Sequence, residues 1–128
     1  MDYTRIYCDA AGESHFEDVA VSVAPLNFAP PAPPVSVAAP IRAERLILAE
    51  FPPAWASNWH PAPRRQFYFH LSGTLEVKAS DGEVRRFSPG SLILLEDTTG
   101  KGHCTRVIGS AVVKGVFLQL PAPENATA

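Results

Sequence analysis

The strongest constraint on this 128-residue chain is the distribution of its prolines. Thirteen residues are proline, and ten of them lie between Pro25 and Pro63. Proline lacks a backbone N–H and disrupts the interior of a helix, so this content favours a helix-poor fold. The chain after Gln66 is almost free of proline. This suits paired strands, because most strand residues donate an N–H to a neighbouring strand.

Composition narrows the class of protein further. Apolar residues make up 46% of the chain and charged residues 19%, so one hydrophobic core can form and a disordered chain is excluded. No apolar run approaches the roughly 20 residues of a membrane helix. The formal net charge of −2 argues against a nucleic-acid partner. Because the N-terminus lacks the basic and apolar regions of a secretory signal, we expect a cytoplasmic protein.

Turn sequences divide the second half of the chain into short strands. Asp81-Gly82 is typical of a two-residue hairpin turn, because both residue types tolerate a positive φ. Ser88-Pro89-Gly90 is a second turn. We therefore predict an all-β sandwich or barrel of about seven to nine strands. The predicted strands are 4–8, 13–23, 45–50, 66–71, 74–79, 83–87, 92–95, 103–108 and 111–120.

The proline-rich segment is predicted to be extended. Residues 28–34 read Phe-Ala-Pro-Pro-Ala-Pro-Pro, which favours polyproline geometry and offers few N–H donors. Such a segment is either a ligand for a partner protein or a rigid strap on the surface of its own domain. Its apolar residues favour the strap; they are Leu26, Phe28, Val35 and Val37. We expect one domain, with N-terminal strands and packed strap in 1–42, a barrel core in 43–120 and a flexible tail in 121–128.

The strand predicted over 66–71 has two different faces. Side chains alternate along a strand, so Gln66, Tyr68 and His70 share one face, while Phe67, Phe69 and Leu71 share the other. The second face is hydrophobic packing. An amide, a phenol and an imidazole need polar partners when they are buried. We therefore expect the first face to line a polar cavity, and open solvent on a one-sided sheet is the alternative.

The histidines fall within two spaced patterns. Glycine, His-x-His, glutamate and glycine make up the first pattern, and this chain has Ala54, His60, Ala62, Gln66 and Gly73 at those positions. The second pattern starts at Gly90, and its first half is two residues longer here. Gly100 and His103 keep the spacing, while Thr98 and Val107 replace a proline and an asparagine. These patterns resemble the two motifs of the cupin family. The resemblance extends over residues 55–120, about half of the chain, and includes the hairpin between the motifs.

The resemblance implies a fold and a metal site. Cupins are small antiparallel β-barrels of the jelly-roll type, also described as a double-stranded β-helix. Carried over by position, the family's metal ligands are His60, Gln66 and His103 here. The implied cofactor is a divalent Fe, Mn, Ni or Zn ion, and no organic cofactor is expected. This set lacks the usual carboxylate, which lowers metal affinity. His70, Glu96 or Asp97 could complete it, and histidines that only bind a ligand or water are the alternative.

Several residues near these positions are candidate ligand contacts. Arg64 could bind a carboxylate or phosphate with two N–H groups, and Trp59 offers a flat apolar surface with one donor. Together with Tyr68 and His70 they form the expected ligand-binding set. A surface location is the alternative for Arg64, and packing at the barrel rim is the alternative for Trp59.

The resemblance leaves two functions open. One is a metal-dependent enzyme of the dioxygenase, isomerase, cyclase or lyase type, acting on a small polar or aromatic molecule. The other is a ligand-binding or sensing domain without metal or chemistry. A third reading, an interaction protein, would use the proline-rich segment as its contact surface. We expect a homodimer, because the apolar set Phe67, Phe69 and Leu71 offers an outward face for a second copy.

Overall fold

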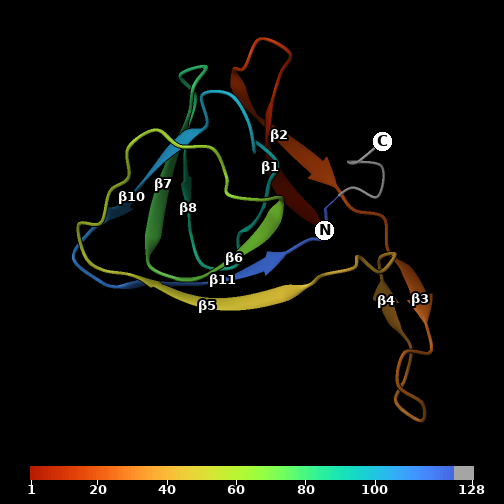
Figure 1. The fold of residues 1–128 in the computed structure, drawn as a ribbon. Helices are drawn as coiled ribbons and strands as arrows, with labels where there is room; N and C mark the ends of the chain where they lie inside the picture. Colours follow the sequence, from red (N-terminus) through yellow and green to blue (C-terminus); the bar gives the residue numbers. More distant parts are fainter. Residues whose placement is uncertain (123–128) are drawn as a thin grey trace.

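The computed structural model describes residues 1–122, which form strands, turns and loops without any helix. Among these residues no helix is long and apolar enough to cross a membrane. The strands are β1 (Asp2–Cys8), β2 (Ser14–Ala20), β3 (Ala24–Leu26), β4 (Val35–Val37), β5 (Arg45–Phe51), β6 (Gln66–Ser72), β7 (Thr74–Ala79), β8 (Val84–Phe87), β9 (Leu92–Leu95), β10 (His103–Ile108) and β11 (Val113–Gln119) (Figure 1).

Two sheets enclose the core. One has six strands in the order β2-β1-β9-β6-β11-β5, and the other has three in the order β10-β7-β8. Buried residues from both sheets form one cluster, including Ile6, Tyr68 and Ile93 from the larger sheet and Leu75 and Val107 from the smaller. Alternation explains this, because every second side chain of a strand points between the sheets. The predicted all-β barrel architecture is confirmed.

The strand pairing differs from the prediction in one respect. We predicted an antiparallel barrel, and most pairs are antiparallel, but β1 pairs with β9 in parallel, with Thr4 opposite Ile93 and Ile6 opposite Leu95. The parallel pair arises because the N-terminal hairpin joins the sheet beside a strand that comes almost ninety residues later. No local turn dictates the direction of such a distant pair.

The outer face of the six-stranded sheet is also apolar. Phe67, Leu94 and Leu120 are buried there beneath partly exposed neighbours; these are Tyr3, Phe69, Leu92 and Leu118. The alternation predicted for 66–71 therefore holds, with Phe67 outward and Tyr68 in the core between the sheets. We expected Phe67, Phe69 and Leu71 to form a contact face for a second copy. Phe67 is buried and Phe69 is partly buried within the chain, and of the three residues Leu71 alone is strongly exposed, at 57%.

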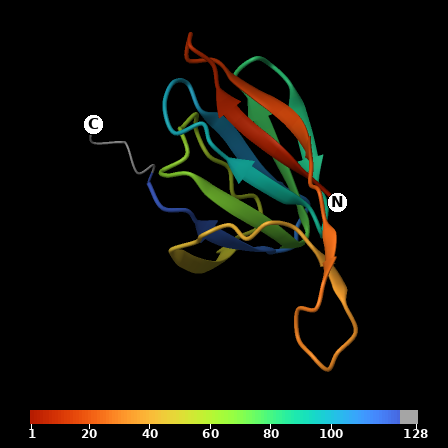
Figure 2. The ribbon, with the colours of Figure 1, turned by 90° about the vertical axis from the view of Figure 1, so that its right-hand side faces the viewer.

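The proline-rich segment is not a packed strap. Residues 24–37 form a separate two-stranded hairpin, β3 with β4, that projects from the barrel (Figures 1 and 2). All residues from 22 to 36 are exposed. The segment pairs with itself because Pro25 removes a donor from β3 and Pro33-Pro34 precede β4, so neither strand extends a barrel sheet. The described residues form eleven strands, whereas seven to nine were predicted. The two strands of this hairpin were not among those predicted. The predicted tail lies almost wholly outside the described residues.

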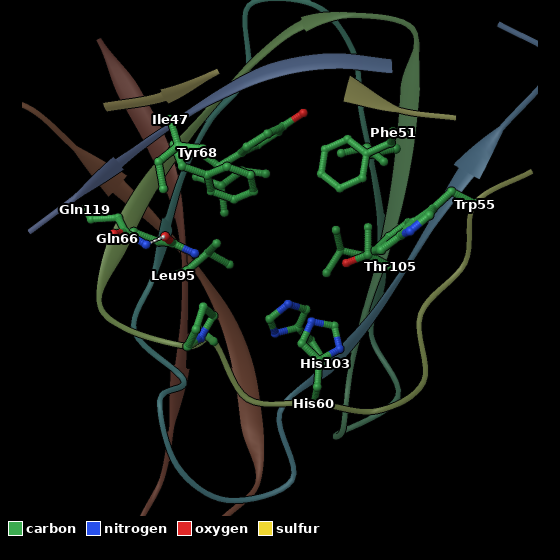
Figure 3. Close-up of a pocket in the computed structure, with 16 residues that line it drawn as sticks. Ile47, Phe51, Trp55, His60, Gln66, Tyr68, Leu95, His103, Thr105 and Gln119 are labelled. Carbon is green, nitrogen blue, oxygen red and sulfur yellow. Dashed lines mark hydrogen bonds between the residues drawn. The ribbon is translucent and has the colours of Figure 1, made fainter. Parts of the chain in front are cut away.

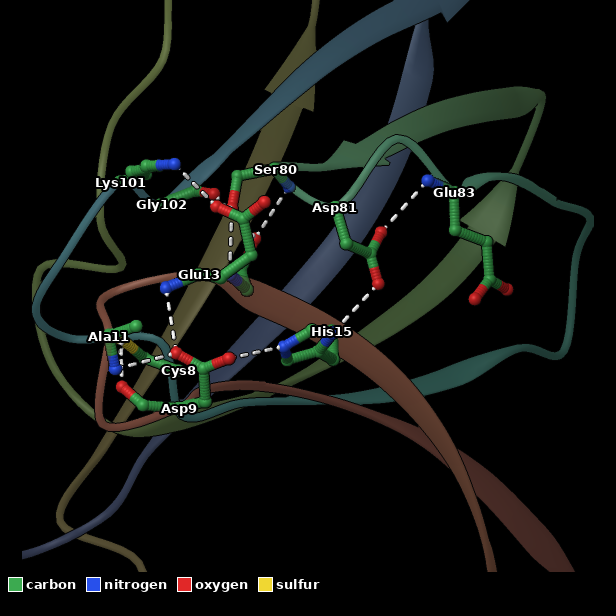
Figure 4. Close-up of polar contacts among 11 residues, drawn as sticks. Cys8, Asp9, Ala11, Glu13, His15, Ser80, Asp81, Glu83, Lys101 and Gly102 are labelled. Atoms are coloured by element: carbon green, nitrogen blue, oxygen red, sulfur yellow. Dashed lines mark hydrogen bonds and ion pairs between the residues drawn. The ribbon is translucent and has the colours of Figure 1, made fainter.

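A polar network joins two hairpin ends at one rim of the barrel (Figure 4). His15 contacts two carboxylates, with Nε2 at 2.7 Å from Asp9 Oδ2 and Nδ1 at 2.8 Å from Asp81 Oδ2. Both ring nitrogens must donate to these acceptors, so the network holds His15 as an imidazolium. The contacts with Asp9 and then Asp81 raise the pKa of His15. In turn, the contact with His15 is the main cause that lowers the pKa of Asp9.

This network predicts a pH-dependent stability. Because the folded pKa of His15 is raised, its stabilisation is complete below about pH 6.5, the unfolded pKa, and is lost as pH rises through the folded pKa. Urea denaturation from about pH 5 to about pH 9 should show a falling free energy of unfolding that His15→Asn abolishes. The control Lys101→Gln removes an ion pair with Glu13 that does not titrate in this range. It should lower stability without changing the slope, and an unchanged slope in the His15 variant would contradict the network.

Candidate functional site

A cavity of about 350 Å³ lies inside the barrel, between the two sheets (Figure 3). Its lining is mainly apolar and aromatic, with a few polar groups at separate positions, which is typical of a small-molecule site. The residues that line it are Ile47, Phe51, Trp55, His60, Ala62, Pro63, Gln66, Tyr68, Leu75, Val77, Ile93, Leu95, His103, Thr105, Phe117 and Gln119.

A backbone bridge places two histidines side by side at one end of this cavity. His60 N donates to His103 O at 3.1 Å, and His103 N donates to His60 O at 2.9 Å. Residues directly opposite each other in an antiparallel pair project to the same face. The two imidazoles are therefore neighbours, with ring centroids 4.7 Å apart (Figure 3).

The other hydrogen bonds of the two rings assign their protons. His60 Nδ1 donates to the Asn58 carbonyl at 2.8 Å. His103 Nδ1 donates to Asp97 Oδ2 at 2.5 Å, and both side chains of this pair are almost fully buried. With Nδ1 protonated in each ring, the two Nε2 atoms carry lone pairs. This end of the cavity is therefore an acceptor site that calls for a hydrogen-bond donor.

The loop before His103 is held by the N-terminal strands. Buried Ser14, at the start of β2, donates from Oγ to the Gly102 carbonyl at 2.7 Å, and Lys101 N donates to the Gly12 carbonyl at 2.9 Å. On the other side, Ala62 N donates to the Asp97 carbonyl at 3.0 Å. These contacts hold Asp97 and His103 in place from outside the cavity. Within residues 1–122, Asp97 Oδ1 is the one buried side-chain polar atom without a partner.

Aromatic rings line another wall of the cavity. Phe51 packs against Trp55 with centroids 4.9 Å apart, and Tyr68 packs against Phe117 at the same distance. Phe51 also contacts Tyr68 at 6.1 Å, which joins the two pairs into one surface. Tilted and edge-on rings at these separations stabilise one another and present flat apolar area to a ligand.

Two amides lie at another side of the cavity from the histidines, beside Leu95 (Figure 3). Gln119 Nε2 donates to Gln66 Oε1 at 3.1 Å, and Arg45 Nε donates to Gln119 Oε1 at 2.8 Å. Both amide oxygens are thus engaged within the protein, whereas Gln66 Nε2 has no hydrogen-bond acceptor among residues 1–122. This side therefore offers a donor, opposite in character to the histidine end.

His70 lies outside the cavity lining, although it shares a strand face with Gln66 and Tyr68. Its Nε2 donates to the Gly73 carbonyl at 2.6 Å, so its Nδ1 accepts from Tyr68 Oη at 3.1 Å. Burial raises the pKa of Tyr68 to about 12, which keeps the phenol protonated as that donor. Both nitrogens of His70 are therefore satisfied, and it anchors the Tyr68 ring.

Two further predicted ligand contacts also lie outside the cavity lining. Arg64 donates from Nη2 to Glu44 Oε2 and to the Leu120 carbonyl, each at 2.6 Å, so its guanidinium is engaged within the chain. Trp59 is 47% exposed and lies beyond the rim, while Trp55 lines the cavity instead. The structure therefore brings together His60, Gln66, Tyr68 and His103, and leaves His70, Arg64 and Trp59 apart.

The donors at this site do not fit a resident metal ion. Two imidazole nitrogens are available, but Gln66 Oε1 already accepts from Gln119, and both nitrogens of His70 are occupied. Of the two candidate carboxylates, Glu96 accepts from Arg5 and Arg65, and Asp97 accepts from His103 Nδ1. Among the residues that the structure describes, no group of three or more metal-binding side chains is assembled. Protein metal sites ordinarily use three or four protein ligands.

Sequence reasoning missed the amide partner and much of the aromatic wall. Gln119 could have been found from alternation, because Val113, Gly115, Phe117 and Gln119 occupy one face of β11. No sequence pattern indicated that Asp97 is the hydrogen-bond partner of His103, because the conformation of the loop between them brings the two side chains together. Thr105 and Ile47 are placed in the lining by pairing between distant strands.

Comparisons with known proteins bear on the fold alone. No family model matches the chain, and no curated protein matches it. Among solved structures, it is similar to a cupin domain from Bordetella pertussis (17% identity, TM-score 0.48, covering 80% of this chain and 96% of that one). It is also similar to the Cnp3 cupin domain of Schizosaccharomyces pombe (15% identity, TM-score 0.46, covering 83% and 72%). The sequence patterns predicted a cupin-type barrel, and both of these similar structures are cupin domains.

The close packing of Gly102 against His60 leads to a prediction about substitutions at this glycine. A Cβ at Gly102 would lie 2.1 Å from the carbonyl carbon of His60, whereas a Cβ at Gly90 would meet nothing within 4 Å. Both glycines have a positive φ, so Gly102→Ala and Gly90→Ala share the same backbone strain of roughly 1 kcal/mol. We expect Gly102→Ala to lower the free energy of unfolding by at least about 1 kcal/mol more than Gly90→Ala, because the bridge must also move. Equal effects in urea denaturation would show that the bridge is not tightly packed.

The donor set predicts weak metal binding. After saturation with Zn²⁺ and dialysis, the protein should retain far less than one ion per chain by elemental analysis, because two imidazoles hold a divalent ion poorly. His60→Ala is the matched variant and should retain a similar trace amount. Stoichiometric metal in the wild type that His60→Ala removes would show that the site completes its ligand set from other residues.

Proposed function

We propose that this chain binds a small aromatic or similarly flat apolar molecule inside the barrel. The observation that carries the proposal is the polarity of the cavity, with acceptors at the two histidines, a donor at Gln66 and aromatic rings along another wall. The cavity volume of about 350 Å³ suits a small molecule.

The hydrogen bonds around the cavity indicate which ligand would fit. The lone pairs of His60 and His103 call for a hydroxyl or amino group on the ligand. Gln66 Nε2 would donate to a carbonyl or carboxylate at another position on the ligand. A ligand without these groups would leave buried polar atoms unpaired, which costs about 1–3 kcal/mol for each group.

A second candidate function is metal-independent proton transfer, of the isomerase or lyase type. The observation that favours it is the buried Asp97–His103 pair, because a carboxylate at Nδ1 orients an imidazole and stabilises its protonated form. His103 Nε2 would take a proton from a C–H beside a carbonyl. The electron pair would move onto the carbonyl oxygen of the resulting enolate, and the imidazolium held by Asp97 would return the proton to carbon.

Binding is tested with two matched probes. 4-Hydroxyacetophenone carries a hydroxyl and a carbonyl at opposite ends, and 4-methylacetophenone lacks the hydroxyl donor. Isothermal titration should show the hydroxylated probe binding about tenfold more tightly, which corresponds to one buried hydrogen bond. A double variant with His60→Ala and His103→Ala should abolish this preference, whereas His15→Asn, at the outer rim, should leave it unchanged. Equal affinities in the wild type would contradict the proposed orientation.

Chemistry is tested separately by proton exchange. Enolisable ketones that bind should exchange their α-protons in D₂O faster with wild-type protein than with Asp97→Asn, by about 100-fold or more if His103 acts as a base. NMR follows the loss of the proton signal. Binding without exchange would leave the ligand-binding function standing and exclude the proton-transfer function for those ketones.

A further inference from the structure

An uncharged arm projects from the barrel, and no other segment of the described chain covers it. Residues 19–41 contain no Asp, Glu, Lys or Arg, a run of 23 residues between Asp18 and Arg42. The hairpin β3–β4 lies within it, and its apolar side chains face solvent; Phe28 is 69% exposed, Leu26 50% and Val35 49%. A two-stranded hairpin of three-residue strands is marginal by itself in water. Such an arm needs a surface to cover it.

The same chain exposes an apolar strand at an open sheet edge. β5 is the last strand of the six-stranded sheet, and within residues 1–122 it pairs only with β11, so its other edge carries backbone groups without a strand partner there. Its outward residues are strongly exposed, with Leu48 at 76% and Leu46 at 61%. Opposite them on β11 lie Val116 and Leu118, which continue into the apolar outer face of the sheet. Exposed apolar edges of this kind favour association.

We propose that the arm of one copy docks on β5 and the adjoining outer face of a second copy. The two copies would exchange arms about a two-fold axis, so that each arm covers the β5 edge of its partner. The apolar side chains of the hairpin would pack on Leu46 and Leu48, and the polyproline turn would lie beyond them. The arm of a single copy projects away from its own barrel (Figures 1 and 2).

Three features favour a second copy over an unrelated protein. The exposed arm and the exposed edge are present on the same chain, which is what a two-fold exchange requires. Both surfaces are apolar, and the arm carries no charge that would demand a complementary partner. The 20 residues from 22 to 41 also match the roughly 20–30 residues that each partner contributes to a stable interface.

The proposed contact borders the cavity. β5 has Leu46 and Leu48 outward, but Ile47 and Phe51 line the cavity from the other face. Ile47 remains 36% exposed in one copy. An arm on the β5 edge would therefore stiffen this cavity wall and shield it from solvent. Loss of the arm contact should weaken probe binding even though no arm residue lines the cavity.

The mass in solution tests the arrangement. Light scattering coupled to size exclusion should give the mass of two chains for the wild type. An arm variant, Leu26→Asp with Phe28→Asp, and a face variant, Leu46→Glu with Leu48→Glu, should each raise the dissociation constant at least about tenfold. The control Val84→Glu with Val112→Glu places the same charges on exposed apolar residues elsewhere and should remain dimeric. Chymotrypsin should cleave at Phe28 faster in the face variant than in the control.

Mixing distinguishes arm exchange from any other dimer. An arm variant paired with a face variant leaves one arm contact intact, formed by the normal arm of the face variant and the normal β5 of the arm variant. The mixture should therefore contain heterodimers at concentrations at which each variant by itself is a monomer. A single-chain mass for the wild type would overturn the proposal, as would a dimer that both variants leave intact or a mixture that shows no rescue.

Discussion

The barrel interior is organised by the paired backbone hydrogen bonds between His60 and His103. These two bonds join the proline-bounded segment 52–65 to the first residue of β10. A second antiparallel bridge, between Ala56 and Arg106, joins the same segment to β10 farther along the strand. Because His60 and His103 are directly opposed, their bridge also decides that two imidazoles share one face. Structure and candidate chemistry therefore depend on the same contact.

The residues around the bridge hold its backbone and its two imidazole rings in place. Gly102 leaves room for the His60 carbonyl, and Ser14 holds the Gly102 carbonyl from the outside. Asn58 and Asp97 fix the two rings through Nδ1, so both Nε2 atoms remain available. Ala54, at the motif position where cupins have a glycine, keeps a left-handed φ of 65° at the entry to this segment.

The replaced motif side chains change what the site can do. With Ala62 and Gln66 at two of the four expected ligand positions, the cavity gains apolar area and an amide pair in place of a metal set. The result is a cavity with acceptors at the two histidines and a donor at Gln66. The open β5 strand forms one wall of it, and this couples the interior to the surface that we assign to a second copy.

Sequence by itself determined the elements that depend on local rules. Alternation in residues 66–71 predicted which side chains face the core, and Asp81-Gly82 and Ser88-Pro89-Gly90 marked the positions of turns. The turn at Asp81-Gly82 is not the predicted two-residue type, because of these two residues only Gly82 has a positive φ and Ala79 N donates to the Glu83 carbonyl. Motif spacing placed His60 and His103 as neighbours of one site. These predictions succeed because strand periodicity and turn chemistry act over a few residues.

Only the tertiary structure decided the features that join distant residues. The parallel pairing of β1 with β9, the amide pair of Gln66 with Gln119, and the satisfaction of His70 by Gly73 and Tyr68 depend on strand order and register. The projecting arm is the clearest case. Its composition was evident, but whether it packs on its own barrel depends on the surfaces within reach, and these exist only once the sheets have formed.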